Sequence, residues 1–379
     1  MKKFLALILA LVMSLSLVAC GGSKEEAKPA EQPAEEQGAD FSVAMITDYG
    51  DITDQSFNQT TYEACKAYCD ANGVDFNYYK PAGDSTAERV AMVEAAVDDG
   101  YTVVVMPGYA FGETITQVAD EYSDITFIAL DVGEGDLGDY TLPSNVYCAV
   151  YQEELCGYMA GYAAVKLGYT HLGFLGGMAV PAVVRYGYGF VQGADAAATE
   201  TGADVTMEYV YGNQFWGDAD ITAYMDNWYQ TLGVEVVFAC GGGIYASAAE
   251  AAAKVGGKVI GVDVDQAAII DGGYGDGMTV TSAMKGLAPT VEHMLTEVAA
   301  GNFANYGGKI ETLGLVSGDD PAANYVQIPM ESTQWSDSFS QDDYKALVKD
   351  MFDGKITVSN DISAMPATSI AVNEYGNIK

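Results

Sequence analysis

The stretch TVVVMPG, residues 102–108, is the part of the sequence that most directly indicates the fold. Three valines and a methionine follow one another without a polar residue, and a Pro-Gly pair ends the run. A strand that is apolar on both faces is typical of the middle of a parallel sheet, where helices cover both sides. The run therefore predicts an α/β protein.

The segments around this run alternate between strand and helix patterns. Before it, the strand FSVAMI (41–46) precedes a helical stretch over 57–72, and TAERVAMVEAAVDDG (86–100) places its apolar residues along one helix face. After it, the helical ETITQVADEYSD (113–124) leads to the strand ITFIALD (125–131). This order predicts right-handed βαβ units and a doubly wound sheet.

The same alternation then begins again. A Gly- and Ala-rich helix over 153–168 opens a second series of strands and helices of similar length. We therefore expect two doubly wound α/β lobes, joined by a hinge, with a cleft between them. The first lobe is assigned residues 41–148 and about 280–305, and the second 149–279 and about 306–379.

The start of the chain differs from the rest. MKK precedes an apolar run of 16 residues, which is short for a membrane span and typical of a signal peptide. The run ends in LVAC, which resembles the lipobox of bacterial lipoproteins, so we predict a signal peptide over 1–19 and lipidation of Cys20. An ordinary secretory signal is the alternative. Residues 21–40 are rich in Gly, Pro, Glu and Gln and predict a flexible tether. The protein is expected at the extracytoplasmic face of the cell membrane, held there by lipid.

The composition restricts the expected partners. Lys and Arg together number 17 against 53 Asp and Glu, a net charge of −36. Nucleic acids are bound by basic surfaces, so no nucleic-acid partner is expected. The cysteines other than Cys20 lack metal-ligand spacing and are interpreted as small core residues. His171 and His293 have no catalytic motif near them, and we expect a monomer that uses no cofactor, metal ion or catalytic residue.

Polar and aromatic residues gather where the expected strands end, which is where open α/β sheets bind ligands. Asp48, Asp54, Phe57 and Asn58 follow the first strand. Further strand ends carry MPGYAFGE (106–113), GGMAVP (176–181), FACGGG (238–243), GVDVDQ (261–266) and SAMKG (282–286). Carboxylates and lysine suit hydroxyl-rich ligands, whereas aromatic rings stack on planar groups. A sugar attached to a planar base needs both.

Several of these motifs occur together in a known family. DQSFN (54–58), VVFACGGG (236–243), IGVDVDQ (260–266) and TSAMK (281–285) resemble, in this order, the basic membrane protein family, also called the PnrA-like lipoproteins. The resemblance covers about residues 41–330. It implies the two-lobed type I periplasmic-binding-protein fold, an ABC permease as partner and a nucleoside ligand, chiefly a purine nucleoside.

The resemblance also implies roles around the base. Phe57 would stack on one face, with Asp54 and Asn58 beside it. Glu113 stands where the family usually has an aspartate for the base edge, which leaves the base preference open. Each residue has a structural alternative, because Phe57 could pack on the sheet, Asp54 could cap the helix and Glu113 could be a solvated acid.

Three aromatic residues are candidates for the second wall. Phe238 in VVFACGGG matches the opposite stacking face, but it also ends an apolar strand and could be a core residue. Phe215 and Trp216, in the aromatic-rich YGNQFWGDAD, are the other candidates. Arg185 and Tyr186 are expected to set lobe packing rather than to bind ligand.

The resemblance further implies that the sugar is held from the second lobe. Gly242 and Gly243 would bring backbone close to it, and Asp263 and Lys285 would hold the ribose hydroxyls through charge-assisted hydrogen bonds. A surface charge pair is the alternative for Lys285.

The leading hypothesis is a nucleoside-binding lipoprotein that closes its lobes on the ligand and docks to a permease. A binding protein for a sugar or an autoinducer-like polyol is the first alternative. An extracellular nucleoside hydrolase is the second, although Asp48, Asp51 and Asp54 are not spaced as a calcium-binding loop.

Overall fold

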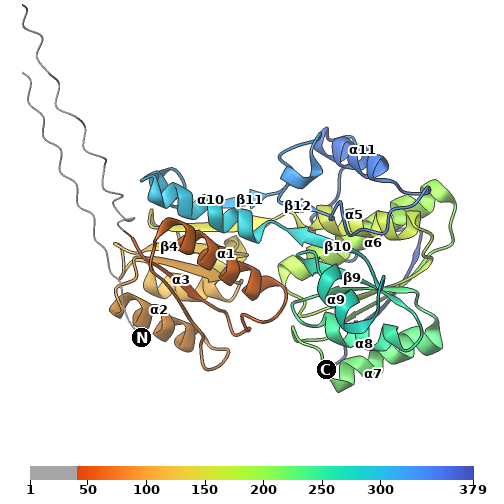
Figure 1. The fold of residues 1–379 in the computed structure, drawn as a ribbon, viewed down its shortest axis with the longest axis horizontal. Helices are drawn as coiled ribbons and strands as arrows, with labels where there is room; N and C mark the ends of the chain where they lie inside the picture. Colours follow the sequence, from red (N-terminus) through yellow and green to blue (C-terminus); the bar gives the residue numbers. More distant parts are fainter. Residues whose placement is uncertain (1–40) are drawn as a thin grey trace, which may run out of the picture. The chain divides into compact units, whose positions relative to one another are not determined.

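The computed structural model describes residues 41–379. The predicted signal peptide (1–19), the lipidation of Cys20 and the predicted tether (21–40) lie outside the described residues. Among the residues that are described, no helix combines the length and the apolar composition that crossing a bilayer requires. The chain forms two predominantly parallel sheets with helices packed on them (Figure 1).

The first lobe is built on a six-stranded parallel sheet with the strand order β11-β5-β4-β3-β1-β2. β3, the stretch that predicted the fold, lies between β1 and β4 and is buried along its whole length. The strands are β1 (Val43–Ile46), β2 (Phe76–Tyr79), β3 (Val103–Pro107), β4 (Thr126–Leu130), β5 (Val146–Tyr151) and β11 (Lys309–Leu313). The helices are α1 (Phe57–Asn72), α2 (Thr86–Asp98), α3 (Phe111–Val118), α4 (Glu134–Leu137) and α10 (Leu287–Ala299), with a 3-10 turn at Phe303–Asn305.

The second lobe is built on a seven-stranded sheet with the order β12-β10-β9-β8-β6-β7-β13, in which only β12 runs antiparallel to its neighbour. Its strands are β6 (His171–Gly176), β7 (Thr206–Tyr211), β8 (Val236–Cys240), β9 (Lys258–Asp263), β10 (Thr279–Lys285), β12 (Val326–Gln327) and β13 (Ala371–Asn377). Its helices are α5 (Glu153–Lys166), α6 (Pro181–Thr201), α7 (Ala219–Asn227), α8 (Tyr245–Ala253), α9 (Ala267–Tyr274) and α11 (Gln341–Phe352). A π-helical turn at Trp228–Leu232 and a 3-10 turn at Pro321–Ala323 complete it.

The two sheets repeat one strand order. Reading β2-β1-β3-β4-β5 in the first lobe against β7-β6-β8-β9-β10 in the second gives the same doubly wound arrangement twice. The prediction of two doubly wound α/β lobes is confirmed. The cysteines at 65, 69, 148, 156 and 240 are all free and buried, as their interpretation as core residues requires.

Between residues 41 and 379 the chain crosses from one lobe to the other at three places. It crosses after β5, after β10, where α10 packs beside α1 (Figure 1), and between β11 and β12. The sequence-based boundaries differ from this arrangement, because β5 extends to Tyr151 in the first sheet and β10 continues to Lys285 in the second. β11 also pairs with β5 in the first lobe, although we expected the second from about residue 306. β11 (KIETL) is a short edge strand without a buried residue, so its polar alternation does not specify which sheet it joins.

α5 and α6 pack with their backbones almost in contact. A Cβ atom at Gly161 of α5 would lie 2.1 Å from the carbonyl oxygen of Phe190, and one at Gly193 of α6 would lie 2.0 Å from that of Tyr158. Only glycine permits such an approach. The close packing places the first turn of α5 against the turn of α6 that carries Arg185, and both turns face the candidate site.

Gly161→Ala is expected to lower the free energy of unfolding by about 2–3 kcal/mol, because the added methyl forces two helix backbones apart. Urea denaturation measures the change. Gly273→Ala on α9 is the control, since a Cβ there meets no atom within 4 Å, and it should not destabilise the protein. An unchanged midpoint for Gly161→Ala would show that α5 and α6 do not pack this closely.

Candidate ligand-binding site

A cavity of about 1000 Å³ opens where the carboxyl ends of strands from both sheets face each other. This is the position at which doubly wound sheets bind ligands. The predicted residues that line it are Asp48, Asp54, Phe57, Asn58, Phe215, Trp216, Gly242, Gly243, Asp263 and Lys285.

Two predicted residues do not reach the cavity. Phe238 has no exposed surface and packs against Phe190, with ring centroids 5.2 Å apart, because β8 is buried on both faces and its central side chains belong to the core. Glu113 is exposed on α3 and accepts a hydrogen bond from the Thr86 hydroxyl at 2.7 Å, on the side facing α2. Phe238 is thus a core residue and Glu113 a solvated acid, which were the alternatives for these two positions. Neither residue lines the cavity.

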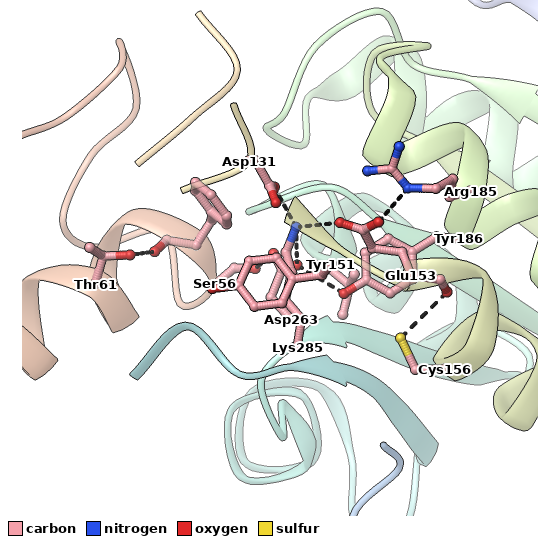
Figure 2. A network of polar contacts seen from close by, with 12 residues as sticks. Ser56, Thr61, Asp131, Tyr151, Glu153, Cys156, Arg185, Tyr186, Asp263 and Lys285 are labelled. Atoms are coloured by element: carbon pink, nitrogen blue, oxygen red, sulfur yellow. Dashed lines mark hydrogen bonds and ion pairs between the residues drawn. The ribbon is translucent and has the colours of Figure 1, made fainter. Parts of the chain in front are cut away.

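The Lys285 ammonium is the centre of the site. Its side chain is 3 % exposed, and Nζ lies 2.5 Å from Asp131 Oδ2, 3.4 Å from Glu153 Oε1 and 3.8 Å from Asp263 Oδ1 (Figure 2). It also lies 4.9 Å from the centre of the Phe57 ring, within cation–π range. The alternative of a surface charge pair for Lys285 is wrong.

Hydrogen bonds from neighbouring side chains fix two of the carboxylates around Lys285. Arg185 donates from Nε to Glu153 Oε2 at 2.6 Å, and Glu153 itself has no exposed surface. Asp263 accepts from the Ser56 hydroxyl at 2.6 Å and from the Tyr186 hydroxyl at 3.3 Å. Arg185 and Tyr186, which we expected only to set lobe packing, therefore line the cavity and hold its charged groups.

Sequence reasoning missed two acids of this network. Asp131 directly follows the buried strand β4, and this strand-end position is the signal that could have identified it, as it identified Asp263. Glu153 begins α5 within a run of two acids, where a solvated first-turn glutamate is the ordinary expectation. Glu153 is buried because Arg185 of α6 and Lys285 pack against it, and its local sequence does not indicate these contacts.

The charges in the network shift one another's pKa values. Burial raises the pKa of Asp131 to about 6, and the neighbouring Lys285 charge opposes the increase. Burial alone would lower the pKa of Lys285, but Asp131, Asp263 and Glu153 outweigh that effect and raise it above its ordinary value. The ammonium therefore stays charged, since its surroundings contain more carboxylates than cations.

Asp131 and Asp263 share an unusual backbone conformation. Their φ angles are +60° and +65°, in the left-handed region that costs a residue with a side chain about 1–2 kcal/mol. They stand at equivalent places in the repeated strand order, after β4 and at the end of β9. This backbone conformation turns both carboxylates toward Lys285. Because it is strained and occurs at both equivalent positions, it indicates a functional constraint.

In the loop after β1, the carboxylate oxygens of Asp54 already accept hydrogen bonds from the backbone. Asp54 accepts from the backbone N–H groups of Ser56, Asn58 and Gln59 at 2.9–3.1 Å, so it caps α1 while also lining the cavity. Burial raises its pKa above the usual value. The side-chain oxygen of Asn58 is buried without a hydrogen-bond partner among the described residues, and Asn58 lines the cavity.

Aromatic rings form walls on both sides of the cavity. Phe57 is half-buried on the first lobe, and Phe215 is half-buried on the second. The Phe215 ring packs over Gly177, where a Cβ would lie 2.4 Å from a ring carbon. Trp216, 54 % exposed, also lines the cavity. Phe215 therefore lines the cavity, whereas Phe238 does not.

Residues 41–349 match the model of the family described as ABC transporter substrate-binding protein PnrA-like. The chain belongs to this family. PnrA-like proteins bind small-molecule substrates for ABC importers and work with a permease. The family is one of binding proteins, as expected for a site assembled from a cleft, aromatic walls and buried charges.

Curated relatives extend over most of this PnrA-like chain. The CD4+ T-cell-stimulating antigen of Listeria innocua is 29% identical over 82% of this chain and 87% of its own length. The ABC transporter nucleoside-binding protein BmpA of Lactococcus lactis is 25% identical over 94% of this chain and 99% of its own.

Solved structures show the same fold. An ABC transporter solute-binding protein from Aeropyrum pernix K1 superposes with a TM-score of 0.64, at 21% identity over 85% of this chain and 88% of that chain. One from Conexibacter woesei also gives 0.64, at 22% identity over 84% and 99%. The expected type I periplasmic-binding-protein fold is confirmed.

Glu154, next to the network on α5, provides a test by pH. It is 3 % exposed, its Oε2 atom has no partner among the described residues, and burial raises its pKa from 4.5 to about 7. Because the unfolded chain loses this proton at lower pH, Glu154 lowers the stability of the folded state as pH rises from about 4.5 to about 7. We therefore compare the difference in the free energy of unfolding between Glu154→Gln and the wild type at two pH values. This difference should be more favourable to the variant at pH 8 than at pH 5, by about 1–2 kcal/mol.

Urea denaturation across this pH range measures the effect of Glu154→Gln. Glu94→Gln, at an exposed position on α2, should give no pH-dependent difference. Parallel stability curves for Glu154→Gln and the wild type would contradict the raised pKa.

Lys285→Met is expected to lower the free energy of unfolding by about 3–5 kcal/mol at pH 7.5, because buried carboxylates lose their shared cation. The loss should be smaller at pH 5, where Asp131 is protonated. Lys80→Met is the matched control, since the Lys80–Asp51 pair of 2.7 Å is exposed and should change stability by less than about 1 kcal/mol. Equal effects of the two substitutions, measured with urea, would contradict the central role of Lys285.

Proposed function

We propose that this PnrA-like protein binds a nucleoside, with a preference for purines, and delivers it to an ABC permease. One observation carries the proposal. The flat face of Phe57 and the charged Lys285–Asp263 pair line one cavity, with the ammonium only 4.9 Å from the ring centre. A nucleoside has the matching chemistry, because a planar base and a ribose with vicinal hydroxyls are joined by a single bond.

The base would lie between Phe57 and Phe215, where two rings from opposite lobes offer stacking surfaces. The unpartnered side-chain oxygen of Asn58 would accept a hydrogen bond from a base N–H group. A bicyclic purine covers more of both rings than a pyrimidine, which favours purines. The name of the Lactococcus lactis relative, a nucleoside-binding protein, supports the ligand class.

The ribose hydroxyls would be held by Asp263 and Lys285, with the backbone at Gly242 and Gly243 close by. Gly242 has a φ of +50°, a conformation that keeps side chains away from this part of the wall. Charged partners make stronger hydrogen bonds to hydroxyls than neutral ones do.

Contacts between the lobes would favour a closed form around the ligand. Ser56 of the first lobe donates to Asp263 of the second at 2.6 Å, and the Gln266 side chain donates to the Gln55 carbonyl at 3.0 Å. We further propose that the protein acts as a monomer and that lipid on Cys20 holds it at the outer face of the membrane, next to its permease. Three Pyrococcus relatives are named lipoproteins, which supports the anchor.

Calorimetric titration with adenosine, guanosine, inosine, uridine and ribose tests the proposal. Purine nucleosides should bind most tightly and free ribose weakly. Phe57→Ala should weaken purine nucleoside binding about ten- to hundredfold, the range for losing one aromatic stacking partner. Phe352→Ala is the control, because Phe352 is 47 % exposed on α11 and lies outside the cavity lining.

Other outcomes would replace this proposal. Tight binding of ribose or another polyol without any nucleoside would indicate a sugar or polyol ligand. If chromatography detects free base released from inosine, the protein is a nucleoside hydrolase.

A further inference from the structure

A segment outside the family match reaches the ligand cavity. The match ends at residue 349, and the chain then continues across the second lobe as residues 354–379, here called the strap. We infer that the strap positions the loop of residues 212–218, which carries Phe215 and Trp216, and so sets how tightly the cavity binds its ligand. The effect on ligand affinity rests on the proposed function, whereas the effect on the loop does not.

The strap forms hydrogen bonds with side chains of α6. The Gln192 side chain donates to the Ser359 carbonyl at 3.0 Å and accepts from the Ser359 N–H at 2.9 Å. Asp195 accepts from both the N–H and the hydroxyl of Ser369, at 2.7 and 2.6 Å. Between these two attachments, Ile362 lines the cavity itself. The strap therefore contributes directly to the cavity wall.

The strap then adds a strand to the second sheet. β13 pairs in parallel with β7, next to the buried carboxylate of Glu208. That carboxylate accepts from Tyr375 at 2.7 Å and from Asn373 at 3.1 Å, and it also contacts the His171 ring at 3.0 Å. Two strap side chains thus satisfy one buried acid, so the strand is held in a defined register.

Beyond β13, the strap contacts the loop of residues 212–218. The N–H of Ile378 donates to the Tyr211 carbonyl at 2.8 Å, immediately before this loop. Lys379 donates to the side-chain oxygen of Gln214 at 3.3 Å and pairs with Asp218. Contacts therefore exist on both sides of the two aromatic residues.

Gln214 connects Lys379 with other residues of the loop through hydrogen bonds. Its side-chain nitrogen donates to the Trp216 carbonyl at 2.8 Å and to Asp218 at 2.9 Å. Lys379 thus completes a connected set of polar groups around Phe215 and Trp216. A loop ordered before binding costs less entropy to fix in the complex, so its anchoring increases affinity.

Two variants separate anchoring from general stability. A chain ending at Gly376 keeps Asn373 and Tyr375 on Glu208 but lacks the contacts of Ile378 and Lys379. Lys379→Ala removes one side chain alone. Lys355→Ala is the matched control, because this strap lysine pairs with Asp350 at 2.6 Å, on α11.

The first readout is acrylamide quenching of tryptophan fluorescence in the free protein. Of the three tryptophans, Trp216 is 54 % exposed and Trp228 is 1 % exposed, and a Trp216→Phe protein supplies the background of the other two. The chain ending at Gly376 should change the quenching of Trp216, and Lys379→Ala should change it in the same direction. Lys355→Ala should not.

The second readout is the dissociation constant of the tightest-binding nucleoside. It should rise about three- to tenfold for the chain ending at Gly376 and about two- to fivefold for Lys379→Ala, with Lys355→Ala unchanged. A lower melting temperature without a change in quenching, or quenching and affinity equal to those of the wild type, would overturn the inference. If the wild type binds no nucleoside, the proposed function fails, and quenching of the free protein still decides whether the strap holds the loop.

Discussion

The burial of one ammonium group organises the site and the connections between the lobes. Lys285 is the last residue of β10, at the point where the chain leaves the second lobe for the first. Its carboxylate partners come from the end of β4, the start of α5 and the end of β9. Moving an ion into a protein interior costs several kcal/mol, so these contacts have to be maintained together. The arrangement therefore ties the relative position of the lobes to the chemistry of the cavity.

The repeated strand order explains how the acids reach Lys285. In these doubly wound sheets the carboxyl ends of the strands face the cleft, and the equivalent strands β4 and β9 bring Asp131 and Asp263 there from the two lobes. Their shared left-handed backbone turns each carboxylate inward. The close packing of α5 on α6 adds Glu153 and Arg185 from a third direction. The network is thus a consequence of topology combined with one glycine-dependent helix contact.

The sequence predicts those features that depend on local pattern. The apolar run at 102–108 and the alternation around it predicted both lobes, and strand-end positions identified Asp263, Lys285 and Phe57. Phe238 was misplaced because a strand buried on both faces directs aromatic side chains into the core as readily as toward a ligand. Phe215 occupies the cavity wall because Gly177 leaves room for its ring, a condition that depends on two segments distant in sequence.

The strap and β11 illustrate a second limit. Both are exposed edge segments with weak apolar periodicity, so local pattern does not determine which sheet they join. β13 is fixed instead by the buried carboxylate of Glu208, whose two partners in the strap, Asn373 and Tyr375, lie more than a hundred residues away in sequence. Such pairings follow from the requirement that a buried acid be satisfied, and only the folded chain shows which groups satisfy it.

The hydrogen bonds of Asp263 also determine what a ligand can gain in this cavity. Both of its oxygens accept from protein hydroxyls, Ser56 and Tyr186. A ligand hydroxyl that replaces one of them exchanges one hydrogen bond for another, so the net gain is small. Polar contacts of this kind select the ligand by geometry more than they increase its affinity. For the proposed nucleoside, the larger part of the affinity would then come from burying the flat base against Phe57 and Phe215, which both line the cavity.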